Sequence, residues 1–125
     1  MKLKDDFFKI ENISINDDKV EYAIRLNQEH FIYKAHFPEN PITPGVCIIQ
    51  IIKELTEENL QCELFFRKAA KIKFLNVINP IENETVNIIL SITEGKADIK
   101  IEATVFYSNI TFSRLSFVAE RIEDI

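Results

Sequence analysis

The sequence has few of the residues that several common functional sites require. Only two glycines occur in 125 residues, Gly45 and Gly95, so neither a phosphate-binding loop nor a dinucleotide-binding fingerprint can be written in it. The two cysteines, Cys47 and Cys62, are too few for a disulfide framework or a zinc site. These absences disfavour nucleotide-binding folds and predict that both cysteines are small buried apolar residues.

The sequence also lacks an uninterrupted apolar stretch of the length that a signal peptide or a membrane-spanning helix needs. Its 15 Lys and Arg against 20 Asp and Glu give a formal net charge of -5, so the overall field repels nucleic acid. We therefore expect a cytoplasmic protein with no membrane span and no nucleic-acid partner. The length and the 46% of hydrophobic residues predict a single globular domain over residues 1–125.

Alternating apolar and polar residues predict that most of the chain forms strands. The clearest set is Val20, Tyr22, Ile24 and Leu26, which follows a turn signal and would form a hairpin with a strand over residues 8–15. Further strands are expected over residues 72–74, 86–92, 99–107 and 110–119. In the last of these the alternation changes phase, which a β-bulge near Ser113 and Arg114 would explain.

One long helix is predicted, over residues 46–59, with its apolar residues gathered on one side. Three prolines lie just before it, so residues 30–40 should form a fixed loop without regular helix. Thr43 suits an N-cap and Pro44 suits the first helical position. A single helix inserted between a hairpin and a run of strands predicts an α+β fold, with a curved sheet covering the helix.

The segment over residues 36–46, His-Phe-Pro-Glu-Asn-Pro-Ile-Thr-Pro-Gly-Val, resembles the signature of the hotdog-fold 3-hydroxyacyl-acyl-carrier-protein dehydratases. Every fixed position of that family's motif is present in register, and the stretch over residues 71–80 resembles the family's later strand and proline turn. The resemblance implies a hotdog fold, in which a long antiparallel sheet wraps one helix and two protomers pair. It also implies a hydro-lyase of fatty-acid biosynthesis and lipid metabolism, acting on acyl-carrier-protein-linked acyl thioesters.

Removing water from such a thioester requires a base for the α-proton, an acid for the departing hydroxyl and a donor that polarises the carbonyl. The resemblance makes His36 the base and the backbone amide of Gly45, at the positive end of the helix, the donor. It further assigns substrate binding to Phe37, Pro44 and Val46. No metal and no dissociable cofactor is implied, since the chemistry needs only proton transfer and a polarised carbonyl.

The sequence departs from the family fourteen residues after His36, where the dehydratases place a Glu or Asp contributed across the dimer interface. This chain has Gln50 there, and an amide is not a practical proton donor. Glu54 follows one turn later, where the family often has Gln. Three interpretations are open: Glu54 supplies the carboxylate, Gln50 supports an altered reaction, or the chain needs a related partner chain that supplies the acid. Glu54 could equally be an ordinary solvated residue.

Weaker signals concern partners and alternative functions. The basic residues Arg67, Lys68, Lys71 and Lys73 form a candidate docking patch for an acidic carrier protein, although such a run is more often a solvated strand face. A homodimer, an oligomer of dimers or a heterodimer fits the resemblance. The competing functions are a non-catalytic acyl-binding subunit, which Gln50 favours, and a hotdog thioesterase with Glu54 as its base.

Overall fold

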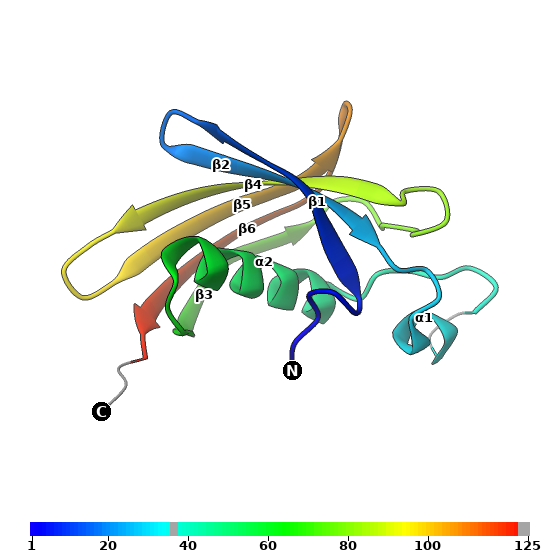
Figure 1. Ribbon diagram of the computed structural model, residues 1–125, viewed down its shortest axis with the longest axis horizontal. Helices are drawn as coiled ribbons and strands as arrows, with labels where there is room; N and C mark the ends of the chain where they lie inside the picture. Colours follow the sequence, from blue (N-terminus) through cyan, green and yellow to red (C-terminus); the bar gives the residue numbers. More distant parts are fainter. Residues whose placement is uncertain (36–37, 123–125) are drawn as a thin grey trace.

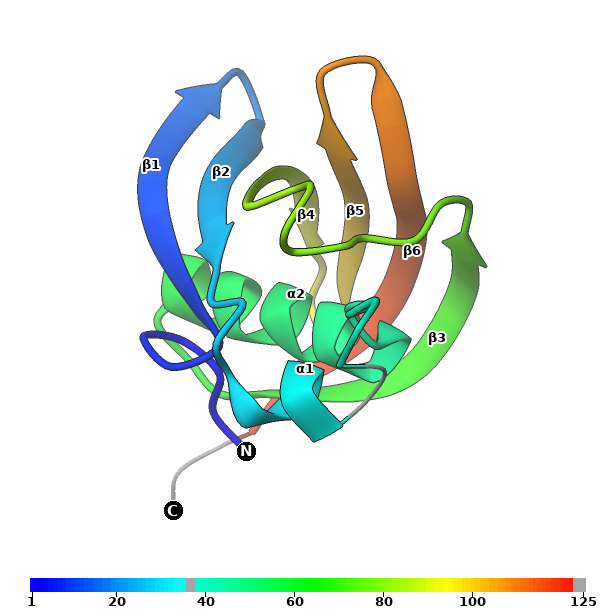
Figure 2. The ribbon, with the colours of Figure 1, turned by 90° about the vertical axis from the view of Figure 1, so that its right-hand side faces the viewer.

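The computed structural model describes residues 1–35 and 38–122, in which six antiparallel strands form one curved sheet around a central helix (Figures 1 and 2). The strands are β1 (Phe8–Asn16), β2 (Lys19–Leu26), β3 (Leu64–Phe74), β4 (Thr85–Glu94), β5 (Ile99–Tyr107) and β6 (Ile110–Arg121), and the helices are α1 (Phe31–Ala35) and α2 (Gly45–Leu60). The hotdog fold expected from the sequence is confirmed. No described helix has the length and apolar character needed to cross a membrane.

The order of strands in the sheet is β1-β2-β4-β5-β6-β3. The chain therefore forms the β1–β2 hairpin, passes through α1 and α2, and lays β3 at the far edge of the sheet. The meander β4–β5–β6 then fills the space between β2 and β3, with every neighbouring pair antiparallel. As a result β1 and β3 are the two edge strands, on opposite sides of α2 (Figure 2).

Helix α2 forms because its apolar residues share one face, and that face packs into the hollow of the sheet. Ile52 and Leu55 are fully buried, and Ile51 is 2% exposed. Across from them the inward residues of the central strands, such as Leu90 and Ile101, are fully buried as well. One core therefore joins the helix to the sheet, and the helix predicted over residues 46–59 is confirmed within one residue at each end.

The start of α2 differs from the prediction. Pro44, and not Thr43, is the N-cap, and no side chain caps the helix there. The Thr43 hydroxyl instead forms a hydrogen bond with the Tyr33 hydroxyl, at 2.8 Å. The buried Thr43 hydroxyl is therefore already bonded to Tyr33, and it does not cap the free amides at the start of α2. Sequence spacing identified a residue type suited to capping but not the competing partner.

The expectation of a loop without helix over residues 30–40 is wrong in its first part, because α1 forms there. The prolines begin only at Pro38, so they do not prevent a short helix before them. The ring Nδ1 atom of His30 accepts a hydrogen bond from the Ile32 amide, at 3.1 Å, and so satisfies one of the first free amides of α1.

Strand β3 begins earlier than the strand predicted over residues 72–74. The prediction missed its first part because two irregularities interrupt the alternation of apolar and polar residues. Its register with β6 shifts between Phe66 and Lys68 and again between Ala69 and Lys71. Extra residues at these shifts bend and twist an edge strand. The bulge expected near Ser113 and Arg114 of β6 lies slightly earlier, between the partners of Val105 and Phe106, since Phe112 and Ser113 are both buried.

The shared core predicts a strong contrast between two identical substitutions. Ile52→Ala should lower the free energy of unfolding by about 2–5 kcal/mol, because it leaves a cavity between α2 and the sheet. Ile15→Ala, at a side chain that is 78% exposed, should change it by less than about 0.5 kcal/mol. Urea denaturation measures both values, and equal losses would contradict this location of the core.

Candidate active site

The motif segment ends in the helix N-terminus that the sequence singled out at Gly45. Within the described residues no acceptor bonds the amides of Gly45 and Val46, while the amides of Cys47 and Ile48 bond the Pro44 carbonyl. Free amides at a helix N-terminus carry partial positive charge and point away from the helix. The backbone therefore offers hydrogen-bond donors at the place where a carbonyl-polarising group was expected.

Gly45 is also closely covered. A Cβ atom at this position would lie 2.7 Å from Cζ and 2.9 Å from Cε2 of the Phe74 ring. The ring, which comes from edge strand β3, therefore rests on the glycine and leaves no space for a side chain. Phe74 is itself 51% exposed, so its ring has room to move outward. Glycine at this position therefore allows the Phe74 ring to approach the start of α2 closely, and a larger residue would push the ring outward.

A mostly apolar hollow of about 310 Å³ lies beside this contact. We call it the Gly45 hollow; it is lined by residues 42–45, Ile48 and residues 74–77. Pro44, the candidate substrate-binding residue, and Gly45, the candidate carbonyl donor, therefore line the same hollow. Val46 is 67% exposed and is not among the lining residues. His36 and Phe37 lie outside the residues that the structure describes.

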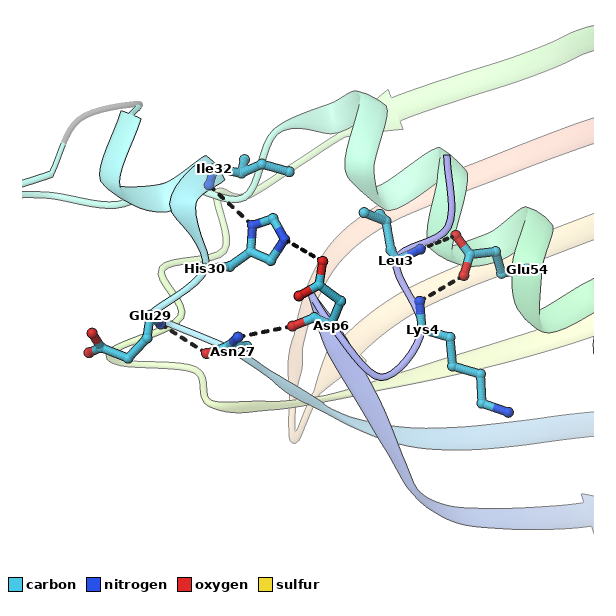
Figure 3. A network of polar contacts seen from close by, with 8 residues as sticks. All are labelled: Leu3, Lys4, Asp6, Asn27, Glu29, His30, Ile32 and Glu54. Atoms are coloured by element: carbon cyan, nitrogen blue, oxygen red, sulfur yellow. Dashed lines mark hydrogen bonds and ion pairs between the residues drawn. The ribbon is translucent and has the colours of Figure 1, made fainter.

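Gln50 and Glu54 lie elsewhere, in an open polar groove of about 760 Å³ between α2 and residues 1–4. The Glu54 carboxylate accepts hydrogen bonds from the amides of Leu3, at 2.7 Å, and Lys4, at 2.8 Å, as Figure 3 shows. Gln50 Nε2 donates to the same carboxylate, at 2.8 Å, and to the Met1 carbonyl, at 2.7 Å. We call this the Gln50–Glu54 groove.

These contacts give Glu54 a structural task. Three donors converge on its carboxylate, and Leu3, whose backbone amide is one of them, is only 2% exposed. Beside it the Glu58 carboxylate forms an ion pair with Lys4, which raises the pKa of that ammonium group. Glu54 is therefore neither a freely solvated residue nor a carboxylate without partners. It anchors residues 1–4 along α2.

His30 is a residue that the sequence reasoning did not consider. Its ring is 6% exposed, its Nε2 atom lies 3.1 Å from Oδ2 of Asp6, and its Nδ1 atom accepts from the Ile32 amide (Figure 3). The ring also lies against Phe7 and Phe31. Because Nδ1 accepts, the ring proton is on Nε2 and is donated to Asp6. Both ring nitrogens form hydrogen bonds, so His30 supports α1 and is not a free base. Asp6 is 24 residues away in the sequence, so no local sequence pattern indicates this contact.

The basic residues on β3 divide into two groups. Arg67 forms an ion pair with Asp98, at 2.9 Å. Ile72 pairs with the inward residue Leu115, so its neighbours Lys71 and Lys73 point to the outer face of the sheet. Lys68 pairs with Val118, and Lys73 with Arg114. The structure thus brings three lysines and Arg114 together on the outer face, at the β3 edge.

Cys47 and the described acidic groups suggest no other chemistry. The thiol of Cys47 is buried, and burial raises its pKa, so it stays protonated and is a poor nucleophile. Cys62 is only partly buried, and the two cysteines are not joined by a disulfide. In the described ranges, 1–35 and 38–122, no group of three or more His, Cys, Asp or Glu side chains is placed to hold a metal ion.

A curved sheet around one helix, with a free helix N-terminus beside an apolar hollow, defines the hotdog class of proteins. The family model described as ApeI-like, ApeI dehydratase, matches residues 12–111. The chain therefore belongs to the ApeI-like dehydratase family.

One known dehydratase is similar in sequence, and two solved structures share the fold. The 3-hydroxyacyl-[acyl-carrier-protein] dehydratase FabZ of Caldicellulosiruptor bescii is 28% identical over 108 residues, which is 77% of this chain and 68% of that protein. The dehydratase heterocomplex ApeI:P from Xenorhabdus doucetiae is similar in structure, with a TM-score of 0.73, 18% identity, and coverage of 90% and 96%. A hypothetical thioesterase with coenzyme A from Streptococcus pneumoniae also shares the fold, with a TM-score of 0.66, 9% identity, and coverage of 94% and 87%.

The anchoring role of Glu54 leads to a test on stability. Glu54→Gln should lower the free energy of unfolding by about 1–3 kcal/mol and speed hydrogen exchange at the amides of Leu3 and Lys4, because a neutral amide replaces a charged acceptor. Glu58→Gln is the matched control, since it removes an exposed ion pair and should cost less than about 1 kcal/mol. If Glu54→Gln speeds exchange at these two amides no more than Glu58→Gln does, Glu54 is not the anchor.

Proposed function

We propose that this chain takes part in the dehydration of 3-hydroxyacyl thioesters, with His36 as the base and a related partner chain supplying the acid. His36 removes the proton from the carbon next to the carbonyl, and the carbonyl oxygen gains negative charge. The bond from the next carbon to the hydroxyl oxygen then breaks, and the hydroxyl leaves as water after receiving a proton from the acid. The product is a 2-enoyl thioester.

The observation that carries this proposal is the helix N-terminus beside the Gly45 hollow. Donors that are fixed before the reaction stabilise charge that develops on a carbonyl oxygen, and such donors are among the largest contributors to catalysis. The apolar lining suits an acyl chain, while the free amides suit its thioester carbonyl. His36 comes nine residues before Gly45 within the dehydratase motif, so one loop supplies both groups.

The missing acid supports a partner chain. Gln50 stands where the resemblance places the acid, and the Glu54 carboxylate is already bound by Gln50 and by the amides of Leu3 and Lys4. Drawing Glu54 away from these donors would leave two backbone amides and one side-chain amide without an acceptor, which costs free energy. The same contacts make Glu54 a poor base for thioester hydrolysis. The similar ApeI:P structure is a dehydratase heterocomplex, and this too supports a second, related chain.

The edge strand β3 is suited to meet such a chain. Phe74 joins this strand to Gly45, so a partner that extends the sheet along β3 would bring its own helix close to the Gly45 hollow. The exposed apolar side chains of Phe65, Ile72 and Phe74 lie along the same strand, and their burial would favour association. Two protomers of this chain alone would build the same contact but would supply Gln50 in place of an acid.

The proposal predicts how purified single-chain protein behaves with a 3-hydroxyacyl thioester, followed by absorbance of the enoyl product. The wild type should turn over slowly, and the exchange variant Gln50→Glu with Glu54→Gln should gain activity by roughly 100-fold or more, as expected for a general acid. His36→Ala on the exchange background should abolish it. Exchanging the two groups keeps one amide and one carboxylate in the groove and leaves its net charge unchanged, although the donor to the Met1 carbonyl is lost.

The other outcomes separate the competing functions. Release of free thiol would identify a thioesterase. Binding of the thioester without turnover in any variant, even after addition of a related hotdog chain with an acid, would identify an acyl-binding subunit. Rapid dehydration by the wild type alone, unaffected by Glu54→Gln, would remove the need for a partner chain.

The basic residues on the outer face of β3 form a candidate docking surface for a protein that carries the acyl thioester. We propose that Lys68, Lys71 and Lys73, with Arg67 beside them, bind an acidic acyl carrier protein. Charge reversal in Lys68→Glu with Lys71→Glu should weaken carrier binding at least tenfold at low salt and much less at high salt, because screening removes the attraction. The matched control is Lys19→Glu with Lys100→Glu, which reverses two charges on other strands. If Lys68→Glu with Lys71→Glu weakens carrier binding no more than this control does, docking at β3 is contradicted.

A further inference from the structure

Strand β6 holds a buried hydroxyl group that has no hydrogen-bond partner. Ser113 is 0% exposed, and among the described residues no donor or acceptor bonds its Oγ atom. Buried hydroxyls in folded proteins almost always have a partner, because an unpaired one costs free energy. An alanine at this position would avoid that cost, so stability alone does not account for the serine.

The hydroxyl lies on the inner face of the sheet, in a row with two other side chains. Ser113 pairs with Val105 of β5 on one side and with Phe74 of β3 on the other. Directly paired residues of antiparallel strands point to the same face, and Val105, at 1% exposed, faces the core. The far end of the Phe74 ring, its Cζ atom, would lie 2.7 Å from a Cβ atom at Gly45. Ser113 therefore lies at the base of the side chain whose tip covers the start of α2.

The Phe74 ring separates this hydroxyl from the Gly45 hollow, and the ring has room to turn outward. It is 51% exposed, so turning away from the glycine removes little buried apolar area. The backbone that follows it is fixed, because the amides of Leu75 and Asn76 both donate to the Phe112 carbonyl, at 2.8 Å and 3.1 Å. Rotation of one side chain, with the strand in place, would thus extend the hollow toward Ser113.

We propose that Ser113 is a specificity-determining residue at the inner end of the Gly45 hollow, where its hydroxyl binds a hydroxyl group on the acyl chain of the substrate. This inference rests on the function proposed above, in which the thioester carbonyl meets the free amides at the start of α2. A hydroxyl on the ligand suits Ser113 because each of the two groups can donate or accept. The apolar lining of the hollow contacts the remaining carbons of the chain.

The recognised hydroxyl belongs beyond carbon 3 of the acyl chain. The tip of the Phe74 ring lies at Gly45, and the backbone of Phe74 lies opposite Ser113. The length of a phenylalanine side chain therefore separates the carbonyl donor from the serine, whereas two bonds separate the carbonyl carbon from carbon 3. A substrate with its carbonyl at Gly45 reaches Ser113 with a later carbon, so the hydroxyl that leaves in the reaction is not the one that Ser113 binds.

Binding of matched ligands tests this subsite without any turnover. The probes are the pantetheine amides of hexanoic acid and of its 5-hydroxy and 6-hydroxy derivatives, in which nitrogen replaces the thioester sulfur. They have no hydroxyl at carbon 3 to lose and no thioester to hydrolyse. The wild type should bind at least one hydroxylated amide roughly 3- to 10-fold more tightly than the hexanoic amide, as expected for one hydrogen bond. Calorimetric titration measures each Kd.

Ser113→Ala should abolish this preference and leave the Kd of the hexanoic amide unchanged. Thr56→Val is the matched control, because Thr56 also has a fully buried hydroxyl, which donates to the Ile52 carbonyl at 2.7 Å. The control should keep the preference and lower the urea midpoint of unfolding, whereas Ser113→Ala should not lower that midpoint. Equal binding of all the amides by the wild type, or a preference that survives Ser113→Ala, would overturn the proposal.

Phe74→Ala tests the role of the ring as a cover. Stopped-flow measurement should show faster association of every amide, because the ring no longer has to turn away, while the preference for the hydroxylated amide remains. Unchanged association rates would overturn this role of Phe74. The double variant with Ser113→Ala should bind as fast as Phe74→Ala and show no preference.

The enoyl assay keeps the failure of this inference separate from the failure of the dehydratase function. Enoyl product from a 3-hydroxyhexanoyl thioester, without any preference among the amides, would refute the Ser113 subsite and leave the function standing. A preference that depends on Ser113, with no enoyl product from any form of the chain or with an added partner chain, would support the subsite and refute the function. Failure of every amide to bind would refute the subsite.

Discussion

Burial of one face of α2 in the curve of the sheet is the interaction on which the other features depend. A helix of 16 residues is marginal by itself, and a sheet with one apolar face needs a cover. Once Ile52 and Leu55 face the sheet, the rotation of the helix about its axis is set. Gln50 and Glu54 must then lie along a different side of the helix. Gly45 lies at the N-terminus of α2, against the Phe74 ring of β3.

The same rotation separates two groups of residues that the dehydratase reaction would have to combine. The Gly45 hollow opens toward edge strand β3, whereas the Gln50–Glu54 groove runs along the side of α2 that residues 1–4 cover. Within one protomer these surfaces are distinct. A reaction that draws one group from each surface is therefore naturally shared between two chains, and a chain can lose its acid while its hollow and its free amides remain intact.

The sequence predicted the architecture well because the periodic spacing of apolar residues, in the strands and in α2, indicates which side of each element is buried. Alternation in β2, β4 and β5 and the apolar face of α2 gave these elements nearly correct bounds, since each is packed regularly against the core. The prediction was incomplete where regularity is interrupted. Register shifts hide most of β3, and α1 forms from residues whose support comes from His30.

The candidate site was predictable only in part, for a related reason. The helix start and Gly45 follow from local residue order, so they could be inferred. The partners of Glu54 and His30 could not, because these contacts join residues about 50 and 24 positions apart and leave no local signature. The prediction that Thr43 is the N-cap was wrong for the same reason, since its hydroxyl forms a hydrogen bond with Tyr33, ten residues earlier.

The anchor at Glu54 also limits which residues can stand at positions 3 and 4. Glu54 bonds the backbone of Leu3 and Lys4 and not their side chains, so the carboxylate does not depend on which side chain stands at Lys4. Proline is the exception, because it has no amide hydrogen to donate. Among related proteins that retain an acidic residue at this place on the helix, the residue facing it at position 4 can thus vary as long as it is not proline, whereas the buried side chain of Leu3 remains constrained by the core.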